Sequence, residues 1–201
     1  MHPNSAFRWE DRDSLRAFAS EIGFGTLFSA TPDGPRVAHV PFVFLDEDRI
    51  GFHLARGNGL TKHLDGAEAL FVVTGPDAYI SPDWYSLDQN QVPTWNYLAL
   101  ELQGPVRKLD NDGLTAQVEA VTALQEARLV PKPAWTHDKM DAGIFPKMLG
   151  AIVGFEMRVT AWRGTAKLGQ NKPEAARASA ADALDAAGQK AMAHLMRTLQ
   201  Q

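Results

Sequence analysis

A short segment after Arg56 combines glycines, a hydroxyl and a cation, which are the groups that bind anions. Residues 57–59 (Gly-Asn-Gly) precede Thr61 and Lys62 and open a short helix. Backbone N–H groups at a helix start, a threonine hydroxyl and a lysine ammonium together form a small anion pocket. Arg56 could add a bidentate phosphate contact. The plainer interpretation is a glycine-rich turn beside a solvated lysine.

Two common nucleotide-binding motifs do not fit this segment. In the dinucleotide fingerprint a third glycine follows the first two, but Lys62 occupies that position. The spacing and the Gly-Lys-Ser/Thr ending of a triphosphate-binding loop are also missing from it. The anion pocket and the plain turn therefore both stay open on the residues alone.

Other patterns of catalysis or metal binding are weak. The chain has no cysteine, which excludes disulfides, thiolate metal sites and cysteine nucleophiles. Its 6 histidines show no His-x-x-x-His spacing, so we expect no metal site. No Gly-x-Ser-x-Gly elbow occurs, and no catalytic residue can be named. His39, beside Val40 and Pro41 in a strand pattern, is the best candidate for a buried polar contact.

Four aromatic residues flank a polar segment near the middle of the chain. Trp84 and Tyr85 precede it, and Trp95 and Tyr97 follow it. Each taken singly is best interpreted as core or dimer packing. As a group beside an anion pocket, they could form the walls around a planar ring.

The apolar spacing predicts mainly strands, with helices between them. Amphipathic helices are expected at 11–22 and 111–129, short helices at 60–64 and 141–149, strands at 24–29, 36–45, 49–55, 67–74, 94–109 and 151–162, and an ordered polar loop at 76–93. Asn111 is the expected cap of the longer helix. Ten alanines between residue 173 and the end predict two Ala-rich helices there.

This order of elements predicts the fold class. Six or so strands in mostly sequential order favour an antiparallel barrel with helical additions over alternating β-α-β units. We therefore expect a mainly β fold with helices, of the α+β class. At roughly 150 residues per domain, the 201 residues correspond to one domain with an appendage.

The charge distribution argues against a broad nucleic-acid surface. With 20 basic and 24 acidic residues the net charge is -4. Only residues 108–172 are net positive, with 9 basic and 7 acidic residues giving +2. The scattered Lys167, Lys172 and Lys190 form no basic DNA-reading helix. A secretory signal and a long apolar run are missing from the pattern, so we expect a cytoplasmic protein without a membrane segment.

Several segments together resemble the PaiB-like family of FMN-binding negative transcriptional regulators. The matching segments are 1–7 (MHPNSAF), 39–42 (HVPF), 53–58 (HLARGN), 79–85 (YISPDWY), 92–97 (VPTWNY), 147–149 (KML) with 151–156 (AIVGFE), and 167–168 (KL) with 170–172 (QNK). They occur in the order of the family and span most of the chain. His2 stands where many members have tyrosine, and Gly169 where serine is common.

The resemblance implies a split β-barrel over residues 1–172, like that of the pyridoxamine-phosphate oxidases, with a helical tail at 173–201. It further implies a homodimer with FMN at the interface, and it favours the anion pocket over the plain turn. The implied cofactor residues are Arg36, Val37, Ala38, His39, Val40, Pro41, His53, Leu54, Ala55, Arg56, Asn58, Thr61 and Lys62, with Thr94, Trp95 and Asn96 near the ring or ribityl chain.

Two functions are compatible with this resemblance. The first is a flavin-dependent oxidoreductase or flavin reductase that acts on an unidentified small molecule, with the polar aromatic loop as a substrate mouth. The second is a non-catalytic FMN-binding negative regulator of transcription that acts through DNA or protein partners. The net charge and the lack of a readable helix-turn-helix argue against direct DNA binding.

Overall fold

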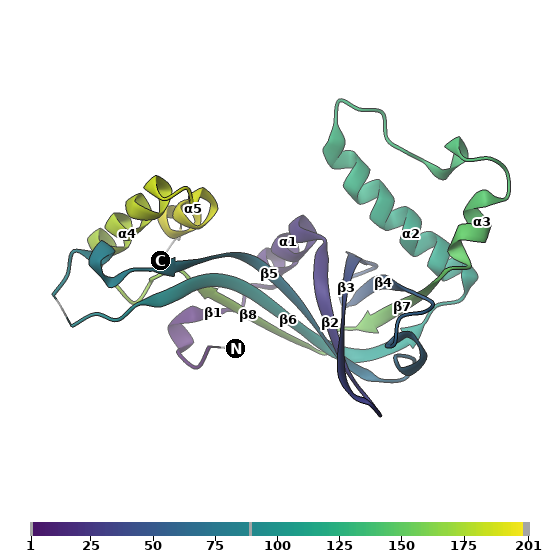
Figure 1. Cartoon of the computed structure of the whole chain (residues 1–201), viewed down its shortest axis with the longest axis horizontal. Coiled ribbons are helices and arrows are strands. Elements are labelled where there is room, and N and C mark those ends of the chain that lie inside the picture. Colours follow the sequence, from purple (N-terminus) through teal and green to yellow (C-terminus); the bar gives the residue numbers. More distant parts are fainter. Residues whose placement is uncertain (1, 89, 199–201) are drawn as a thin grey trace. The chain divides into compact units, whose positions relative to one another are not determined.

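In the computed structural model of the chain, residues 2–88 and 90–198 are described (Figure 1). They divide into two compact units. The barrel unit comprises residues 16–73 and 101–162, and the terminal unit comprises the described parts of 1–15, 74–100 and 163–201. Four elements contribute residues to both units: α1 (Arg12–Ile22), β5 (Glu68–Ile80), β6 (Thr94–Lys108) and β8 (Ala161–Lys167).

Six strands form a closed ring in the barrel unit. They are β2 (Phe24–Thr31), β3 (Gly34–Phe44), β4 (Arg49–Ala55), β7 (Ile152–Arg158) and the barrel-unit parts of β5 and β6. Pairing runs in the order β5, β2, β3, β4, β7 and β6, and β6 also pairs with β5, which closes the ring. The five pairs β5–β2, β2–β3, β3–β4, β4–β7 and β7–β6 are antiparallel. Closure leaves few free strand edges, and it confirms the predicted mainly β fold.

Phenylalanine side chains fill the interior of this barrel. Phe42, Phe52, Phe71 and Phe155 are fully buried. The Phe71 ring lies 4.9 Å from that of Phe42 and 5.8 Å from that of Phe52, which in turn stacks 6.1 Å from Phe155. These rings come from β3, β4, β5 and β7, so the core joins strands that are far apart in the sequence. Truncating one such ring to alanine typically costs about 3–5 kcal/mol.

A cluster of charges ties together the last strands of the ring. Glu156 on β7 accepts hydrogen bonds from Arg107 on β6 at 2.9 and 3.1 Å and from Arg49 on β4 at 3.3 Å. Glu156 is buried, and the two arginines reach it from the strands on either side. The carboxylate therefore links β4, β7 and β6 through side chains as well as through the ladder.

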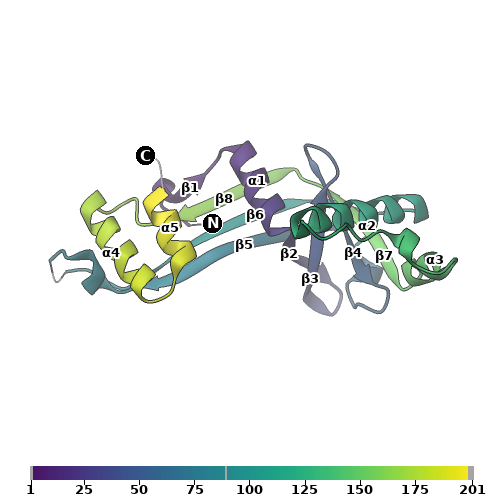
Figure 2. The same ribbon diagram turned by 90° about the horizontal axis from the view of Figure 1, so that it is seen from above.

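Helix α2 (Asn111–Glu126) packs on β3, β4 and β7 (Figure 2). The predicted cap Asn111 is wrong by one residue, because the Asp110 side chain accepts the hydrogen bond from the Gly113 N–H. The helix also ends earlier than predicted, and a 3-10 turn, η4 (Ala127–Leu129), follows it. Two further short elements come next, η5 (His137–Lys139) and α3 (Ile144–Leu149).

The predicted strand at 151–162 is two strands in the structure. After β7 the chain turns at Val159 and Thr160, whose N–H groups donate to the carbonyls of Asp48 and Gln103, and then continues as β8. The turn contains no glycine or proline, so the local pattern did not indicate it. Gly104 permits the close approach, because a Cβ there would lie 1.8 Å from the Arg158 carbonyl oxygen.

The expected loop at 76–93 also begins later than predicted. β5 continues through Pro76 to Ile80, and a 3-10 helix, η3 (Pro82–Tyr85), follows. Proline removes a ladder donor and is tolerated where a strand is paired on one side only. The β2–β5 ladder pairs Val72 as its last β5 residue, so Pro76 lies beyond it.

In the terminal unit, β1 (Arg8–Trp9) pairs with β8. Helices α4 (Glu174–Ala186) and α5 (Lys190–Thr198) pack on each other through buried Ala180, Ala181 and Met192. These are the two Ala-rich helices that the sequence predicts, and small side chains permit their close packing. A short 3-10 turn, η1 (Ser5–Phe7), precedes β1, and η2 (Thr61–His63) lies in the barrel unit. None of the described helices is long and apolar enough to cross a membrane.

Candidate functional site

Strands β3 and β4 separate at one point of the barrel wall. Among the described residues their ladder consists of three pairs, from Phe44 with Ile50 to Phe42 with Phe52. Beyond Phe42, β3 pairs with β2, and beyond Phe52, β4 pairs with β7. Pro41, the first β3 residue past the last pair, has no N–H to donate, which suits the end of a ladder. The predicted runs 36–41 and 53–56 therefore flank one split between neighbouring strands.

The strand pleat divides the side chains of the split into two sets. Ala38, Val40 and Leu54 are buried in the core, so they can offer a ligand only their main-chain groups. The side chains of Arg36, Val37, His39 and Ala55 are exposed, and that of Pro41 is half-buried. Half of the predicted strand residues thus present side chains to the outside.

The turn after β4 is held by its own polar side chains. The Asn58 Oδ1 accepts from the Leu60 N–H at 2.9 Å, and the Thr61 hydroxyl donates to the Ala55 carbonyl at 2.9 Å. The threonine proton is therefore already used within the turn, and its lone pairs remain. The short helix predicted at 60–64 is present as η2.

Arg56 is committed to the protein rather than free for a ligand. Its Nε donates to the Gly150 carbonyl at 2.8 Å, and its Nη2 donates to the Ile152 carbonyl at 3.1 Å. A bidentate fork to phosphate would have to use the guanidinium protons that these two bonds leave over. Arg56 thus fixes the turn against the chain before β7.

Lys62 and Arg36 are the cations that remain available beside the split. Both side chains are exposed, and neither has a hydrogen-bond or ion-pair partner among the described residues. Nothing crowds the turn either, because a Cβ at Gly57 or Gly59 would meet open space. The structure therefore leaves one available cation on each of the two chain segments that diverge at the split, with an open glycine turn beside Lys62, and an anion site needs such groups.

A buried amide, Gln117 of α2, contacts the split and was not predicted. Its Oε1 lies 3.0 Å from the Nδ1 of His53. Because an amide oxygen can only accept a hydrogen bond, the Nδ1 of His53 is the donor. Gln117 is 0% exposed, and its Nε2 has no partner among the described residues. Its one sequence signal is position, because it follows Leu114 by three residues in the apolar stripe of α2. With Glu156 and other residues it lines a cavity of about 450 Å³.

The outer face of β2 and β3 carries exposed apolar side chains. Phe24, Phe28 and Val37 are 51%, 38% and 49% exposed, and we call them the apolar patch. Between them lie Thr26 and His39, opposite each other in the ladder and hydrogen-bonded at 3.0 Å. Three exposed apolar side chains on one strand pair are typical of an interaction surface.

Thr94, Trp95 and Asn96 belong to the terminal unit. Thr94 accepts a hydrogen bond from Lys167, Trp95 meets Tyr79 edge to face, and Asn96 is buried. Their contact with a flavin stays a prediction.

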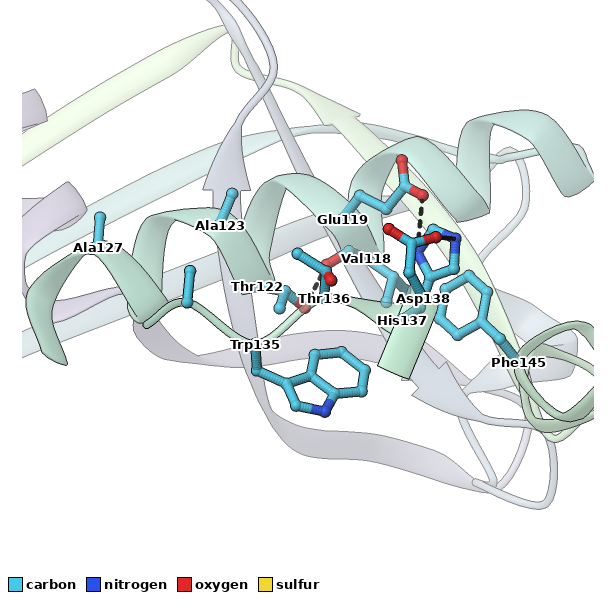
Figure 3. A pocket seen from close by; sticks show the side chains of 11 residues that line it. Val118, Glu119, Thr122, Ala123, Ala127, Trp135, Thr136, His137, Asp138 and Phe145 are labelled. Atoms are coloured by element: carbon cyan, nitrogen blue, oxygen red, sulfur yellow. Dashed lines mark hydrogen bonds and ion pairs between the residues drawn. The ribbon is translucent and has the colours of Figure 1, made fainter. Parts of the chain in front are cut away.

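A separate cavity of about 340 Å³ lies between α2 and the segment 134–138 (Figure 3). His137 lies in its wall, 3.3 Å from the Glu119 carboxylate and stacked 4.4 Å from the Phe145 ring. The rest of the lining is mostly apolar, from Val118 and Ala123 to Trp135. None of the predicted cofactor residues lines this cavity, so it is distinct from the split.

Comparison with known proteins shows the family to which the chain belongs. Residues 1–161 match a family model described as "Putative FMN-binding domain". "Protease synthase and sporulation protein PAI 2" of Bacillus subtilis (strain 168) is 30% identical over 178 residues, which cover 87% of this chain and 84% of that protein.

Two solved structures share the fold at low sequence identity. One is an FAD and heme binding protein of Mycobacterium smegmatis, with a TM-score of 0.56 and 18% identity over 80% of this chain and 73% of that chain. The other is the flavocytochrome Anf3 of Azotobacter vinelandii, with a TM-score of 0.57 and 14% identity over 83% and 72%. Together with the matched model and the 30% identical relative, the split barrel shows that this chain belongs to the PaiB-like family of FMN-binding domain proteins, whose cofactor is FMN.

Proposed function

We propose that the β3–β4 split and the turn after β4 hold FMN, with the phosphate group against Lys62 and Arg36. The observation that carries this proposal is the pair of cations on the two diverging strand segments that have no partner in the part of the chain that the structure describes. Buried or half-buried cations in proteins are usually paired, and exposed ones beside an open glycine turn are suited to a phosphate. The buried Nε2 of Gln117, which has no partner among the described residues, is a further donor beside His53.

The chain's own residues would divide the work of binding. Lys62 and Arg36 supply charge, while Asn58, Thr61 and Arg56 keep the turn in shape. Ala38, Val40 and Leu54 would shape the split rather than contact the ligand, since they are paired in the ladders of β3 with β2 and of β4 with β7 and their side chains are used in the core. FMN, when bound, supplies reversible electron and hydride transfer.

We further propose that the apolar patch pairs with a second copy of the chain. Phe24, Phe28 and Val37 lie on the outside of the strand pair that carries Arg36 and His39, so a homodimer would bury the patch next to the flavin. In such a dimer Thr94, Trp95 and Asn96 of the partner subunit can reach the ring. The association of two identical surfaces is the commonest form of protein oligomer.

The activity that we propose is flavin-dependent oxidation or reduction of a small molecule. His39 and His53 are the titratable side chains with a ring nitrogen at the split, and both are hydrogen-bonded to neutral partners. An acid–base set so small leaves the chemistry to the flavin and gives the protein the role of binding and orientation. A cytoplasmic location is part of the same proposal.

Anaerobic mixing with a nicotinamide donor tests this activity. NADH or NADPH is expected to bleach the absorbance of the oxidised flavin in the FMN-loaded protein, with dithionite as the control that the flavin can be reduced. If dithionite bleaches the flavin absorbance but neither NADH nor NADPH does, the proposed flavin reductase activity is contradicted.

The second candidate is a non-catalytic FMN-binding negative regulator of transcription that acts through DNA or protein partners. It is favoured by the name of the Bacillus subtilis relative, which refers to protease synthesis and sporulation, and by the net charge of +2 over residues 108–172. A gel-shift titration at two salt concentrations tests its DNA form, because phosphate contacts weaken steeply with salt. Affinity that does not change with salt, or no affinity, would contradict direct DNA binding.

A further inference from the structure

The segment 167–172 matched the family, yet the flavin site does not use it. It joins the end of β8 to the start of α4 in the terminal unit. Lys167 Nζ donates to the Thr94 hydroxyl at 2.6 Å, and Lys172 Nζ donates to Gln91 Oε1 at 2.6 Å and lies 5.0 Å from the centre of the Tyr85 ring. Both lysines are half-buried, and among the described residues neither forms an ion pair.

A third cation of this unit is buried. Arg177, in the first turns of α4, is 6% exposed, and its Nη1 has no hydrogen-bond partner among the described residues. Arg177 is a neighbour of Gly169, because a Cβ there would lie 3.7 Å from both the Arg177 Cγ and the Asn96 Nδ2. Gly169 has φ +81, a conformation that glycine adopts without strain. Arg177 and Asn96 therefore both border the turn of segment 167–172.

Asn96 is the fourth polar group at this place. It is 1% exposed, its Nδ2 has only the sulfur of Met196 as a partner, at 3.3 Å, and its Oδ1 has none among the described residues. Asn96 and Thr94 lie two residues apart on β6, so their side chains point to the same face of the strand. Lys167, bonded to Thr94, is thus on the face of Asn96.

No carboxylate among residues 2–88 and 90–198 forms an ion pair with Arg177, Lys167 or Lys172. Burying a charged group is costly unless it is paired, and Arg177 is a buried cation. Burial also lowers the pKa of Lys167, as expected for a cation without a carboxylate nearby. The α4 carboxylates of Asp182 and Asp185 are already paired, both with Arg197.

We propose that Arg177, Lys172 and Lys167 form an anion site in the terminal unit, separate from the flavin residues of the barrel unit. The ligand would be a molecule or ion with a carboxylate or phosphate group that also has an O–H or N–H donor. The Asn96 Oδ1, which has no partner among the described residues, would accept a hydrogen bond from that donor. Thr94 and Asn96 border this site and are also proposed to reach the flavin of a partner subunit, so the experiments below distinguish the anion site from the flavin site.

Thermal unfolding of the full-length protein in different anions tests the site. At equal ionic strength, phosphate is expected to raise the unfolding midpoint of the wild type above that in chloride by more than it does in Arg177→Met, because binding at the site adds to the general stabilising effect of phosphate. Sulfate, which has no O–H donor at neutral pH, is expected to be less effective than phosphate. No difference between phosphate and chloride would overturn the proposal.

Two variants and one control identify the residues. Arg177→Met removes the buried charge and Lys172→Met a half-buried one, and each should weaken the apparent phosphate affinity by about tenfold or more. Arg197→Met, in the same unit, removes a cation that already has its carboxylates and should keep the wild-type response. An unchanged response in both Arg177→Met and Lys172→Met would overturn the site, and Lys172→Met remains informative if Arg177→Met does not fold.

The same titration on FMN-loaded protein identifies the source of the anion. If phosphate still stabilises the loaded protein, the site serves a second ligand with an acidic group. If FMN loading abolishes the response and riboflavin loading does not, the phosphate response comes from the phosphate site of FMN, and a separate anion site is contradicted. Because FMN binding is read separately from flavin absorbance, failure of the anion site and failure of the proposed flavin site give different results.

Discussion

Lys62, Arg36 and Arg56 carry the same charge near the β3–β4 split, but they differ in how much of it a ligand can use. Arg56 spends two donors on the carbonyls of Gly150 and Ile152, whereas the other two cations have no partner among the described residues. A donor that already forms a hydrogen bond within the protein must break or share that bond to contact a phosphate, which lowers its net contribution to the binding free energy. We therefore assign the phosphate contact first to Lys62 and Arg36, and the shape of the turn to Arg56.

The sequence could identify these cations but not rank them. Residue type and spacing mark Arg56, Thr61 and Lys62 equally, and only the structure shows that Arg56 and Thr61 bond to main-chain carbonyls. Gln117 could be suspected as a polar residue in an apolar stripe. Its contact with His53 joins residues 64 positions apart, which no local pattern reveals.

Lys167 gives a prediction about pH. Because burial lowers its folded-state pKa below the unfolded value, the unfolded chain binds more protons between the two values, and the free energy of unfolding contributed by this group rises with pH there. Lys167→Met should remove that rise. Urea unfolding in chloride buffer from about pH 8 to about pH 10.5 measures it near the lysine pKa range. Lys190→Met is the exposed control, and an equal slope in wild type and Lys167→Met would contradict the assignment.

At the scale of elements, patterns within one strand or helix predicted well, and turns made by distant residues did not. β4 and the start of β6 agree with the sequence because apolar alternation and flanking turn residues are local. The sequence predicted β7 and β8 as one strand. The turn between them, at Val159 and Thr160, is held by hydrogen bonds to the distant carbonyls of Asp48 and Gln103. The pairing that closes the barrel is likewise decided by contacts between distant strands.

The charge cluster on β7 is expected to stabilise this closure. Glu156→Gln keeps the shape of the side chain but removes the charge that Arg49 and Arg107 share, and hydrogen bonds to charged groups are worth about 1.5–3 kcal/mol. We expect the free energy of unfolding to fall by an amount of about that size in urea titrations. Glu68→Gln, an exposed carboxylate on β5, is the control. An equal free energy of unfolding for the two variants would contradict a stabilising role of the charge cluster in barrel closure.

For the whole molecule, the proposed dimer joins the flavin site and the apolar patch in one assembly. Phe28→Asp or Val37→Asp places a charge in the proposed interface and should yield a monomer in sedimentation velocity, with weaker FMN binding. Met148→Asp, on the exposed face of α3, is the matched control and should change neither property. A monomeric wild-type protein, or a dimer in all three variants, would contradict the role of the patch.

The most direct test compares FMN with riboflavin, which lacks the phosphate, in the wild-type protein and in Lys62→Ala. If Lys62 binds the phosphate, the variant should lose about 1.5–3 kcal/mol of affinity for FMN and almost none for riboflavin, as measured by flavin fluorescence titration. Lys190→Ala should leave both affinities unchanged. Equal losses for the two flavins, or no loss for FMN, would contradict the placement of the phosphate at the β3–β4 split.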